Sequence, residues 1–216
     1  MARLWKLAGV WQISKIIFDM INGKNILAIV PARMGSKRLK MKNIRIFKGK
    51  PLFIWALKSA MASKYIDDTF LTTESKKVQK IAEQYGYYSK YLRNPKLSKD
   101  KTSANEVIID VLKNLKKKYD YFIYLQATSP LRKIYDIDFC IKRIVSGNYD
   151  TLISIYDTKK RIKPNGAIYI NKTKEFLKYR TLFRNKKTTF YRMPKIRSVD
   201  IDRIQDFNKA LKFSTI

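Results

Sequence analysis

A continuous apolar run, ILAIV at residues 26–30, narrows most strongly what this chain can fold into. Apolar side chains at every position, rather than at alternate positions, are typical of a strand that is buried on both faces. From this run onward, strand patterns alternate with helical patterns along the chain. The alternation predicts a three-layer α/β fold, in which helices cover both faces of a mostly parallel sheet.

The same patterns give the order of the expected elements. Further strands are expected at residues 69–72, 88–92, 121–125, 151–155 and 167–170, and helices at residues 51–63, 75–85, 103–118, 136–145 and 204–213. Ligands of such sheets bind at the carboxyl ends of the strands. We therefore expect the functional residues in the loops that follow positions 30, 92, 125 and 170.

Residues 1–24 differ from the rest of the chain. Their apolar side chains, among them Trp5 and Trp11, follow a broadly helical spacing and are interspersed with charges. We predict an N-terminal amphipathic extension at residues 1–24 and one folded domain at residues 25–216. The extension lacks the roughly 18 to 20 uninterrupted apolar residues of a membrane-spanning helix. It is interpreted as a helix packed on the core, a partly disordered segment, or a helix on a membrane surface or a partner.

The cysteine and histidine content limits the chemistry. Cys140 is the only cysteine and histidine is absent, so an internal disulfide is excluded and a structural zinc site is effectively excluded. This composition fits a reducing, cytoplasmic setting. Without histidine, catalysis must rest on carboxylates, lysines, arginines, hydroxyls or a metal held by oxygen ligands.

The formal net charge of +30 attracts polyanions over long distances. The charge is spread along the chain in short clusters, which is typical of a lysine-rich solvated surface. Nucleic-acid binding is not favoured as the main function, because the sequence has no helix-turn-helix signature, RNA-binding aromatic motif or zinc finger. A basic protein that binds nucleic acid or a membrane surface stays open as an alternative.

The loop after the first strand, PARMGSKRLKMKN at residues 31–43, has the composition of an anion site. Its glycine lets backbone N–H groups turn toward an anion, and its cations neutralise a triphosphate. The loop matches neither the GxxxxGK(S/T) motif of ATPases nor the GxGxxG motif of dinucleotide-binding proteins. Taken alone, it predicts a phosphate cradle, although an exposed basic turn would explain it equally well.

This loop resembles the signature of the cytidylyltransferases that activate sialic acid and related nine-carbon keto-acid sugars as CMP esters. The resemblance continues in order through LTTES (71–75), LRNPKLSKDKTS (92–103), LQATSPLR (125–132), PNGAIYI (164–170) and SVDIDRIQDF (198–207). Enzymes for the eight-carbon sugar of lipopolysaccharide share the fold, but PNGAIYI is more like the sialate group. The resemblance implies a Rossmann-like nucleotidyltransferase fold, with residues 25–216 as the catalytic domain.

The resemblance also implies roles for individual residues. CTP would be held by Arg33, Ser36, Lys37, Lys42, Asn43, Arg93 and Ser103. The sugar acid would face Gln126, Ser129, Arg132 and Asn165. Asp200 and Asp202 would bind Mg²⁺, and the catalytic residues would be Lys42, Arg33 and Asp202. The reaction would transfer CMP from CTP to the anomeric hydroxyl of the sugar and release pyrophosphate.

The residue patterns leave alternatives for several of these roles. Asp200 and Asp202 are two positions apart, so on an extended segment both carboxylates point to one face and can bind one hard cation. The alternative is that Asp202 caps the last helix. In the same way, Asn165 and the following glycine form a tight turn in the alternative reading, and Ser129 lies in a loop that leads into a helix.

The sequence departs from the family between the strand pattern that ends near position 155 and PNGAIYI, where it has only about eight residues. The family usually carries a longer insertion there, which forms a dimerisation element and reaches into the partner's active site. We therefore do not expect the usual dimer. The cations of the short connection, Lys159, Lys160, Arg161 and Lys163, are expected to bind the sugar's carboxylate; otherwise the chain binds nucleotide without efficient catalysis. Glu74 stands where the family more often has aspartate.

Overall fold

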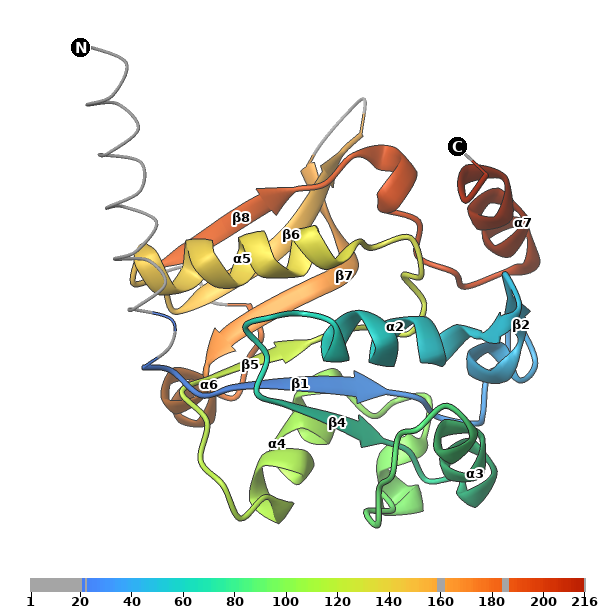
Figure 1. Ribbon diagram of the computed structural model, residues 1–216, viewed down its shortest axis with the longest axis horizontal. Coiled ribbons are helices and arrows are strands. Elements are labelled where there is room, and N and C mark those ends of the chain that lie inside the picture. Colours follow the sequence, from blue (N-terminus) through green and yellow to red (C-terminus); the bar gives the residue numbers. More distant parts are fainter. Residues whose placement is uncertain (1–20, 22, 159–161, 184–186, 216) are drawn as a thin grey trace.

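The computed structural model describes residues 21, 23–158, 162–183 and 187–215. Its main sheet has the strand order β4-β1-β5-β7-β6-β8 (Figure 1). The strands are β1 (Ile26–Pro31), β4 (Asp68–Thr72), β5 (Tyr121–Tyr124), β6 (Thr151–Asp157), β7 (Ile162–Lys172) and β8 (Thr188–Arg192). β7 is antiparallel to β5 and β6, and the other pairings are parallel. The predicted mostly parallel α/β fold is confirmed.

Helices cover both faces of this sheet (Figure 1). One face packs against α2 (Leu52–Met61), α3 (Lys76–Gln84) and α5 (Ile134–Ser146), and the other against α4 (Ala104–Asn114) and α6 (Thr173–Tyr179). A third, smaller core joins α7 (Ile204–Phe213) to the ribbon of β2 (Ile46–Phe47) and β3 (Lys50–Pro51). Figure 1 shows α7 next to this ribbon, on the side of the molecule toward which β1 points.

The side chains of β1 show why the fold has three layers. Ile26, Ala28 and Val30 belong to the core under α2 and α5, whereas Leu27 and Ile29 belong to the core under α4. Each of the five is at most 1% exposed. Because successive side chains of a strand point to opposite faces, an unbroken apolar run requires cover on both sides. The prediction of a doubly buried strand is confirmed.

The predicted strand at residues 88–92 is wrong, since this segment is irregular. The structure satisfies the neighbouring edge of β4 in another way. The hydroxyl of Tyr87 donates to the carbonyl of Thr69 at 2.6 Å and accepts from the amide of Leu71 at 2.8 Å. A side chain thus occupies the backbone groups that a further strand would have paired, and the sheet ends there.

The loop expected to hold functional residues after position 170 is also at the wrong edge of the sheet. Because β7 runs antiparallel, its end lies beside the starts of β5 and β6, where the amides of Lys172 and Thr173 bind the carbonyls of Asp150 and Asp120. The beginning of β7, not its end, therefore reaches the carboxyl edge of the parallel strands. The sequence patterns also missed α6, β8 and the β2–β3 ribbon.

The stretch that is shorter than in the family forms a hairpin here. β6 and β7 pair as far as Asp157 and Ile162, so Lys163 lies in a strand opposite Tyr156 and not in the cationic loop that was expected. The other cations that were expected to bind the sugar's carboxylate lie outside the described residues; they are Lys159, Lys160 and Arg161.

The predicted N-terminal extension lies outside the described residues except at its end. Ile21 is 2% exposed and packs in the core under α2 and α5. Lys24 follows, with its amide bound to the carbonyl of Ile21 at 2.9 Å. Within the described part of the chain, every helix is too short or too polar to cross a membrane.

Candidate functional site

Two adjoining cavities open at the carboxyl edge of the parallel strands. The first has a volume of about 340 Å³ and the second about 590 Å³, and Gln126 and Asp200 line both. Gly166 faces this junction with a φ of +77°, and a Cβ added to it would lie 2.8 Å from Oε1 of Gln126. The positive φ and the close approach both require glycine. Gly166 therefore lets Gln126 and Asp200 stand between the two cavities.

The first cavity gathers most of the residues that the sequence predicts. Its lining includes Arg33, Ser36, Lys42, Asn43, Arg93, Ser103, Gln126, Asp200 and Asp202. Lys37 lines a further cavity of about 350 Å³, which shares Arg33, Lys42 and Asp202 with the first. Four segments that are distant in sequence thus meet around one space.

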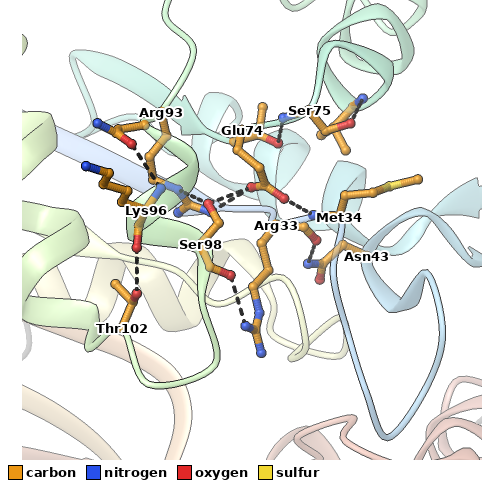
Figure 2. Close-up of polar contacts among 12 residues, drawn as sticks. Arg33, Met34, Asn43, Glu74, Ser75, Arg93, Lys96, Ser98 and Thr102 are labelled. Atoms are coloured by element: carbon orange, nitrogen blue, oxygen red, sulfur yellow. Dashed lines mark hydrogen bonds and ion pairs between the residues drawn. The ribbon is translucent and has the colours of Figure 1, made fainter.

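The loop of residues 31–43 is fixed at both ends. At its start, the amide of Ala32 extends the pairing of β1 with β4 by donating to the carbonyl of Thr72 at 3.0 Å. At its end, the buried Asn43 side chain donates to the carbonyl of Arg33 at 2.8 Å (Figure 2). This bond closes the loop on itself and orients Arg33 toward the cavity.

Glu74 joins three segments around this loop (Figure 2). Its carboxylate accepts from the amide of Met34 at 2.7 Å, the hydroxyl of Ser98 at 3.0 Å and the guanidinium of Arg93 at 3.0 Å. Desolvation opposes its charged form, but these hydrogen bonds and the charge of Arg93 outweigh it and lower the pKa of Glu74. The sequence revealed Glu74 only as a departure from the family, although its position directly after β4 pointed to the site.

Asp100 binds two of the loop's cations. Its carboxylate lies 2.9 Å from Nη1 of Arg33 and 2.7 Å from Nζ of Lys37. The pKa of Asp100 is lowered, first by the hydrogen bond from Lys37 and also by that from Arg33. The motif LRNPKLSKDKTS contains this aspartate, but nothing in the motif's spacing indicated that its side chain would reach the first loop.

Asp202 pairs with cations from the other side of the same loop. Its carboxylate lies 2.8 Å from Nζ of Lys42 and 3.1 Å from Nη1 of Arg38. The alternative that Asp202 caps α7 is wrong, because Asp206 accepts the amide of Arg203 at 2.9 Å and fills that role. Asp202 is therefore available to the cavity.

The environments of Asp200 and Asp202 push their pKa values apart. The pKa of Asp200 is raised, chiefly because surrounding protein atoms desolvate its carboxylate, with a further contribution from the charge of Asp202. Desolvation also opposes the charged form of Asp202, but Lys42 and Arg38 outweigh it and lower its pKa. Buried Ile201 separates the two aspartates, and both line the first cavity, as the spacing argument predicts.

Ser129 and Arg132, which were predicted to face a sugar acid, line neither of these two cavities. Ser129 is 1% exposed and Arg132 is 5% exposed. The guanidinium of Arg132 donates to the carbonyls of Ala167 at 2.6 Å and Gln126 at 3.4 Å, and burial lowers its pKa to about 10. Arg132 thus braces the Gln126 loop against β7 and does not meet a ligand in either cavity.

Asn165 lines the second cavity, but its amide group is occupied by the protein. Its oxygen accepts from Ser154 and from the amide of Ala167, and its nitrogen donates to the hydroxyl of Ser198 at 3.0 Å. Asn165 lies in β7 beside an irregularity in the β6–β7 register, so the tight-turn alternative is wrong. Its bonds tie the strands to the segment that carries Ser198.

The second cavity contains two cations, Lys195 and Lys209, that no sequence pattern indicated as site residues. Lys195 begins a short 3₁₀ helix, η3 (Lys195–Arg197), and Lys209 lies on α7. Tyr169 also lines the cavity, and desolvation together with the charge of Asp200 raises its pKa to about 12. Lys209 lies two positions after the SVDIDRIQDF motif, but a lysine in so basic a chain carries no signal by itself.

The fold and the site together define a class: a three-layer α/β protein with a cationic loop after its first strand and an aspartate pair that lines the same cavity as that loop. The chain belongs to the cytidylyltransferase family, whose model matches residues 27–212. The predicted family resemblance is thereby confirmed.

Individual relatives agree with this assignment. The N-acylneuraminate cytidylyltransferase of Streptococcus agalactiae serotype V is 28% identical over 214 residues, which cover 84% of this chain and 51% of that protein. This chain therefore spans about half the length of the streptococcal relative. The pseudaminic acid cytidylyltransferase of Campylobacter jejuni serotype O:2 is 28% identical over 218 residues, which cover 85% of this chain and 94% of that protein.

A solved structure supports the fold. The CMP:2-keto-3-deoxy-manno-octonic acid synthetase complexed with CTP superposes with a TM-score of 0.69 at 14% sequence identity. The superposition covers 89% of this chain and 100% of that chain. At this identity the likeness establishes the shared α/β architecture.

Proposed function

We propose that this protein transfers CMP from CTP to the anomeric hydroxyl of a sialic-acid-like keto-acid sugar and releases pyrophosphate. The observation that carries the proposal is the meeting of the cationic loop with Asp200 and Asp202 at one cavity, in a chain of the cytidylyltransferase family. The names of the relatives, N-acylneuraminate and pseudaminic acid cytidylyltransferase, favour an acidic sugar as the acceptor.

In this proposal the first cavity holds CTP. Arg33, Lys37 and Lys42 bind the triphosphate, because three cations on one loop offset its charge where it is most concentrated. Gly35 leaves the backbone open to the phosphates, since an added Cβ would meet nothing within 4 Å. Ser36 contributes its hydroxyl from the same loop.

Three further residues complete the proposed nucleotide pocket. Asn43 fixes the shape of the loop through Arg33, and Arg93 forms the opposite wall with its guanidinium held by Glu74. Ser103 caps α4 by accepting the amide of Glu106 at 3.2 Å, and it lines the cavity at the same time. The positive end of the α4 dipole therefore also faces the cavity.

The residues of the site fit a magnesium ion. The carboxylates of Asp200 and Asp202 line one cavity, and Mg²⁺ binds through one or two carboxylates together with substrate phosphates. Among the described residues, no group of three or more acidic, cysteine or histidine side chains forms a closed metal site, which agrees with phosphate oxygens completing the ligand set. When bound, the ion supplies charge neutralisation at the α-phosphate and acidifies the attacking hydroxyl.

The proposed reaction needs positioning and charge neutralisation more than covalent catalysis. The sugar's hydroxyl oxygen forms a bond to the α-phosphorus, the bond to the β-phosphate oxygen breaks in line so that pyrophosphate leaves, and the hydroxyl proton passes to solvent water. Lys42 offsets the charge that grows on the leaving pyrophosphate. Gln126, at the junction of the cavities, orients the acceptor. Such a site explains how a chain without histidine can be an enzyme.

The remaining parts of the proposal concern the whole protein. We infer a catalytic domain at residues 25–216, preceded by an extension that contacts the core, a membrane surface or a partner. A cytoplasmic setting follows from the nucleotide substrate and the cysteine content. The β6–β7 hairpin favours one alternative, a relative that binds CTP without efficient catalysis, because the hairpin stands where the family has its insertion and dimerisation element.

A pyrophosphate-release assay tests the proposal. The wild-type protein is given Mg²⁺, one of CTP, UTP or ATP, and a panel of nonulosonic acids, and we expect release with CTP in the presence of an acid. Thermal stabilisation by CTP without turnover would establish the alternative of an inactive relative. Tight polynucleotide binding with a steep salt dependence and no nucleotide preference would instead indicate a nucleic-acid-binding protein.

Two substitutions test the roles within the site. Asp202→Ala and Lys42→Ala are each expected to lower turnover by at least about 100-fold, because each removes charge from the reacting phosphates. Circular dichroism should show that the fold is kept. Lys40→Ala is the matched control, since this exposed lysine lies on the same loop and lines neither cavity. Full turnover by Asp202→Ala or Lys42→Ala would remove that residue from the mechanism.

A further inference from the structure

The second cavity lies next to the proposed CTP site. It adjoins the first cavity through Gln126 and Asp200, so a molecule bound in it has one end beside the proposed CTP site. The other walls come from the β6–β7 hairpin, η3 and α7. An acceptor in this space must find partners for its charged groups among those elements.

Three carboxylates line the second cavity, those of Asp157, Asp200 and Asp206. Asp157 forms an ion pair with Arg192 at 3.2 Å. Asp206 accepts the backbone amides of Asp202 at 3.1 Å and Arg203 at 2.9 Å. Asp200 faces the first cavity as well. Among the described residues, none of the three carboxylates forms an ion pair with a lysine of the second cavity, so the ammonium groups of those lysines are left to bind another anion.

Lys195 and Lys209 are the lysines in question. Neither forms an ion pair with any residue that the structure describes, and both are exposed to solvent. The ammonium group of Lys209 lies 5.8 Å from the ring centroid of Phe213 on the same helix. Two unpaired ammonium groups in one cavity favour an anionic ligand.

The backbones that carry these lysines are held firmly. Arg197 binds both oxygens of the fully buried Asp136, at 2.9 and 3.1 Å, which fixes η3. Ser198 at the end of η3 accepts from Asn165 at 3.0 Å. η3 also packs against α7. Both lysines therefore extend their flexible stems from anchored and neighbouring elements.

We propose that Lys195 and Lys209 bind the carboxylate of the acidic acceptor, so that the chain builds this part of the site from η3 and α7 of its own fold. The inference rests on the proposed function. It assigns the binding of the acid's charge to two lysines that lie outside the β6–β7 hairpin, where the family's insertion would stand. The first cavity holds the nucleotide, and the second selects an acceptor by its negative charge.

The test compares variants and substrates in one scheme. The variants are Lys195→Met and Lys209→Met, which keep the length of the stem and remove the charge. The substrates are N-acetylneuraminic acid, or whichever acid of the panel gives the highest turnover, and its neutral methyl ester. Lys212→Met is the matched control, since this exposed lysine of α7 does not line the cavity.

For the acid, each variant is expected to raise KM roughly 10- to 100-fold, the value of a lost charge-assisted hydrogen bond. The KM for CTP should stay within about twofold of the wild type, and Lys209→Arg should restore much of the loss. With the methyl ester, the variants and the wild type should react alike, because the charge that the lysines bind is gone. A structural defect would affect both substrates equally.

The outcomes separate this inference from the proposed function. If the wild type turns over the acid and both variants keep its KM, the inference is overturned and the proposed function stands. Equal losses with acid and ester also overturn it. If the wild type shows no turnover, the proposed function fails, and calorimetric titration with the same acid then decides the inference by whether binding depends on the two lysines.

Discussion

The cations of the two cavities are arranged in opposite ways. At the first cavity and beside it, Arg33 and Lys37 pair with Asp100, and Lys42 pairs with Asp202. In the second cavity, Lys195 and Lys209 have no acidic partner among the described residues. A loop with many cations would repel itself, and internal carboxylates remove that repulsion until a polyanion replaces them. The two lysines of the second cavity lie on different elements, η3 and α7, and form no such cluster on one loop.

The two halves of the site, the parts of the protein around the first and the second cavity, are held in place in a similar way. A buried ion pair between an arginine and a carboxylate lies beside each cavity. Arg93 pairs with Glu74 beside the first cavity, and Arg197 pairs with Asp136 beside the second. In both halves the buried pair fixes the backbone, and more exposed cations face the cavity. In the second half, position and ligand binding are thus carried by different residues, whereas Arg93 both fixes the first half and lines its cavity.

The largest expected effect comes from breaking these buried pairs. Arg93→Met and Arg197→Met each leave a carboxylate without its charged partner, which costs about 3 kcal/mol or more of unfolding free energy. For a chain of this size we expect Tm to fall by roughly 6 to 12 °C, measured by thermal unfolding. Arg93→Met should also raise the KM for CTP, whereas Arg197→Met should raise the KM for the acid.

The control is the effect of each substitution on the substrate that binds in the other cavity. Because Arg197 lies beside the second cavity, Arg197→Met should leave the KM for CTP near the wild-type value at temperatures where the variant is folded. If Arg93→Met and Arg197→Met weaken CTP binding equally, the structures around the two cavities depend on each other. The distinction between a nucleotide half and an acceptor half is then wrong.

A smaller effect, on CTP binding, is expected when the cations of the first cavity lose an acidic partner and so become unpaired like those of the second. Asp100→Asn leaves Arg33 and Lys37 unpaired and removes a negative charge near the triphosphate. We expect the Kd for CTP, measured by calorimetry with Mg²⁺, to fall roughly 3- to 10-fold, with a smaller gain at high salt. Tm should barely change, because solvent screens exposed ion pairs and they contribute little to stability.

Glu83→Gln is a suitable control for Asp100→Asn, since it removes one negative charge from an exposed position of α3. Its effect on CTP binding should be within error. Weaker CTP binding by Asp100→Asn would show that Asp100 positions the cations and does not compete with the phosphates.

Local patterns in the sequence were sufficient for much of the fold. The helix predicted at residues 204–213 is α7 without change of bounds, because its apolar stripe and its N-terminal Asp206 are both local signals. The apolar run of β1 likewise fixed the number of layers. The direction of β7 was not predictable in this way, since a strand pattern is the same for parallel and antiparallel pairing.

The site was predictable where motifs supplied it and not elsewhere. Arg33, Lys42 and Asp202 meet at one cavity as the family resemblance implies. By contrast, the burial of Arg132 depends on its hydrogen bond to the carbonyl of Ala167 in β7. The exposure of Lys195 depends on how η3 packs against α7. Such tertiary relationships leave no trace in the spacing of a single motif.

The smallest expected effect is a change in acid sensitivity. Since the pKa of Glu74 is lowered in the folded protein from its usual 4.5, its ionised form stabilises the fold above that pH, and this contribution is lost as the pH falls through the folded value. Glutamine cannot titrate. Glu74→Gln should therefore be less stable than the wild type near neutral pH, yet lose less stability on acidification. Tm values from about pH 7 to about pH 3 measure the two slopes. The double variant Glu74→Gln with Arg93→Met should show the same shallow dependence of Tm on pH as Glu74→Gln. If its Tm instead falls with pH as steeply as that of the wild type, the charge of Glu74 is not what makes the Glu74–Arg93 pair stabilise the fold.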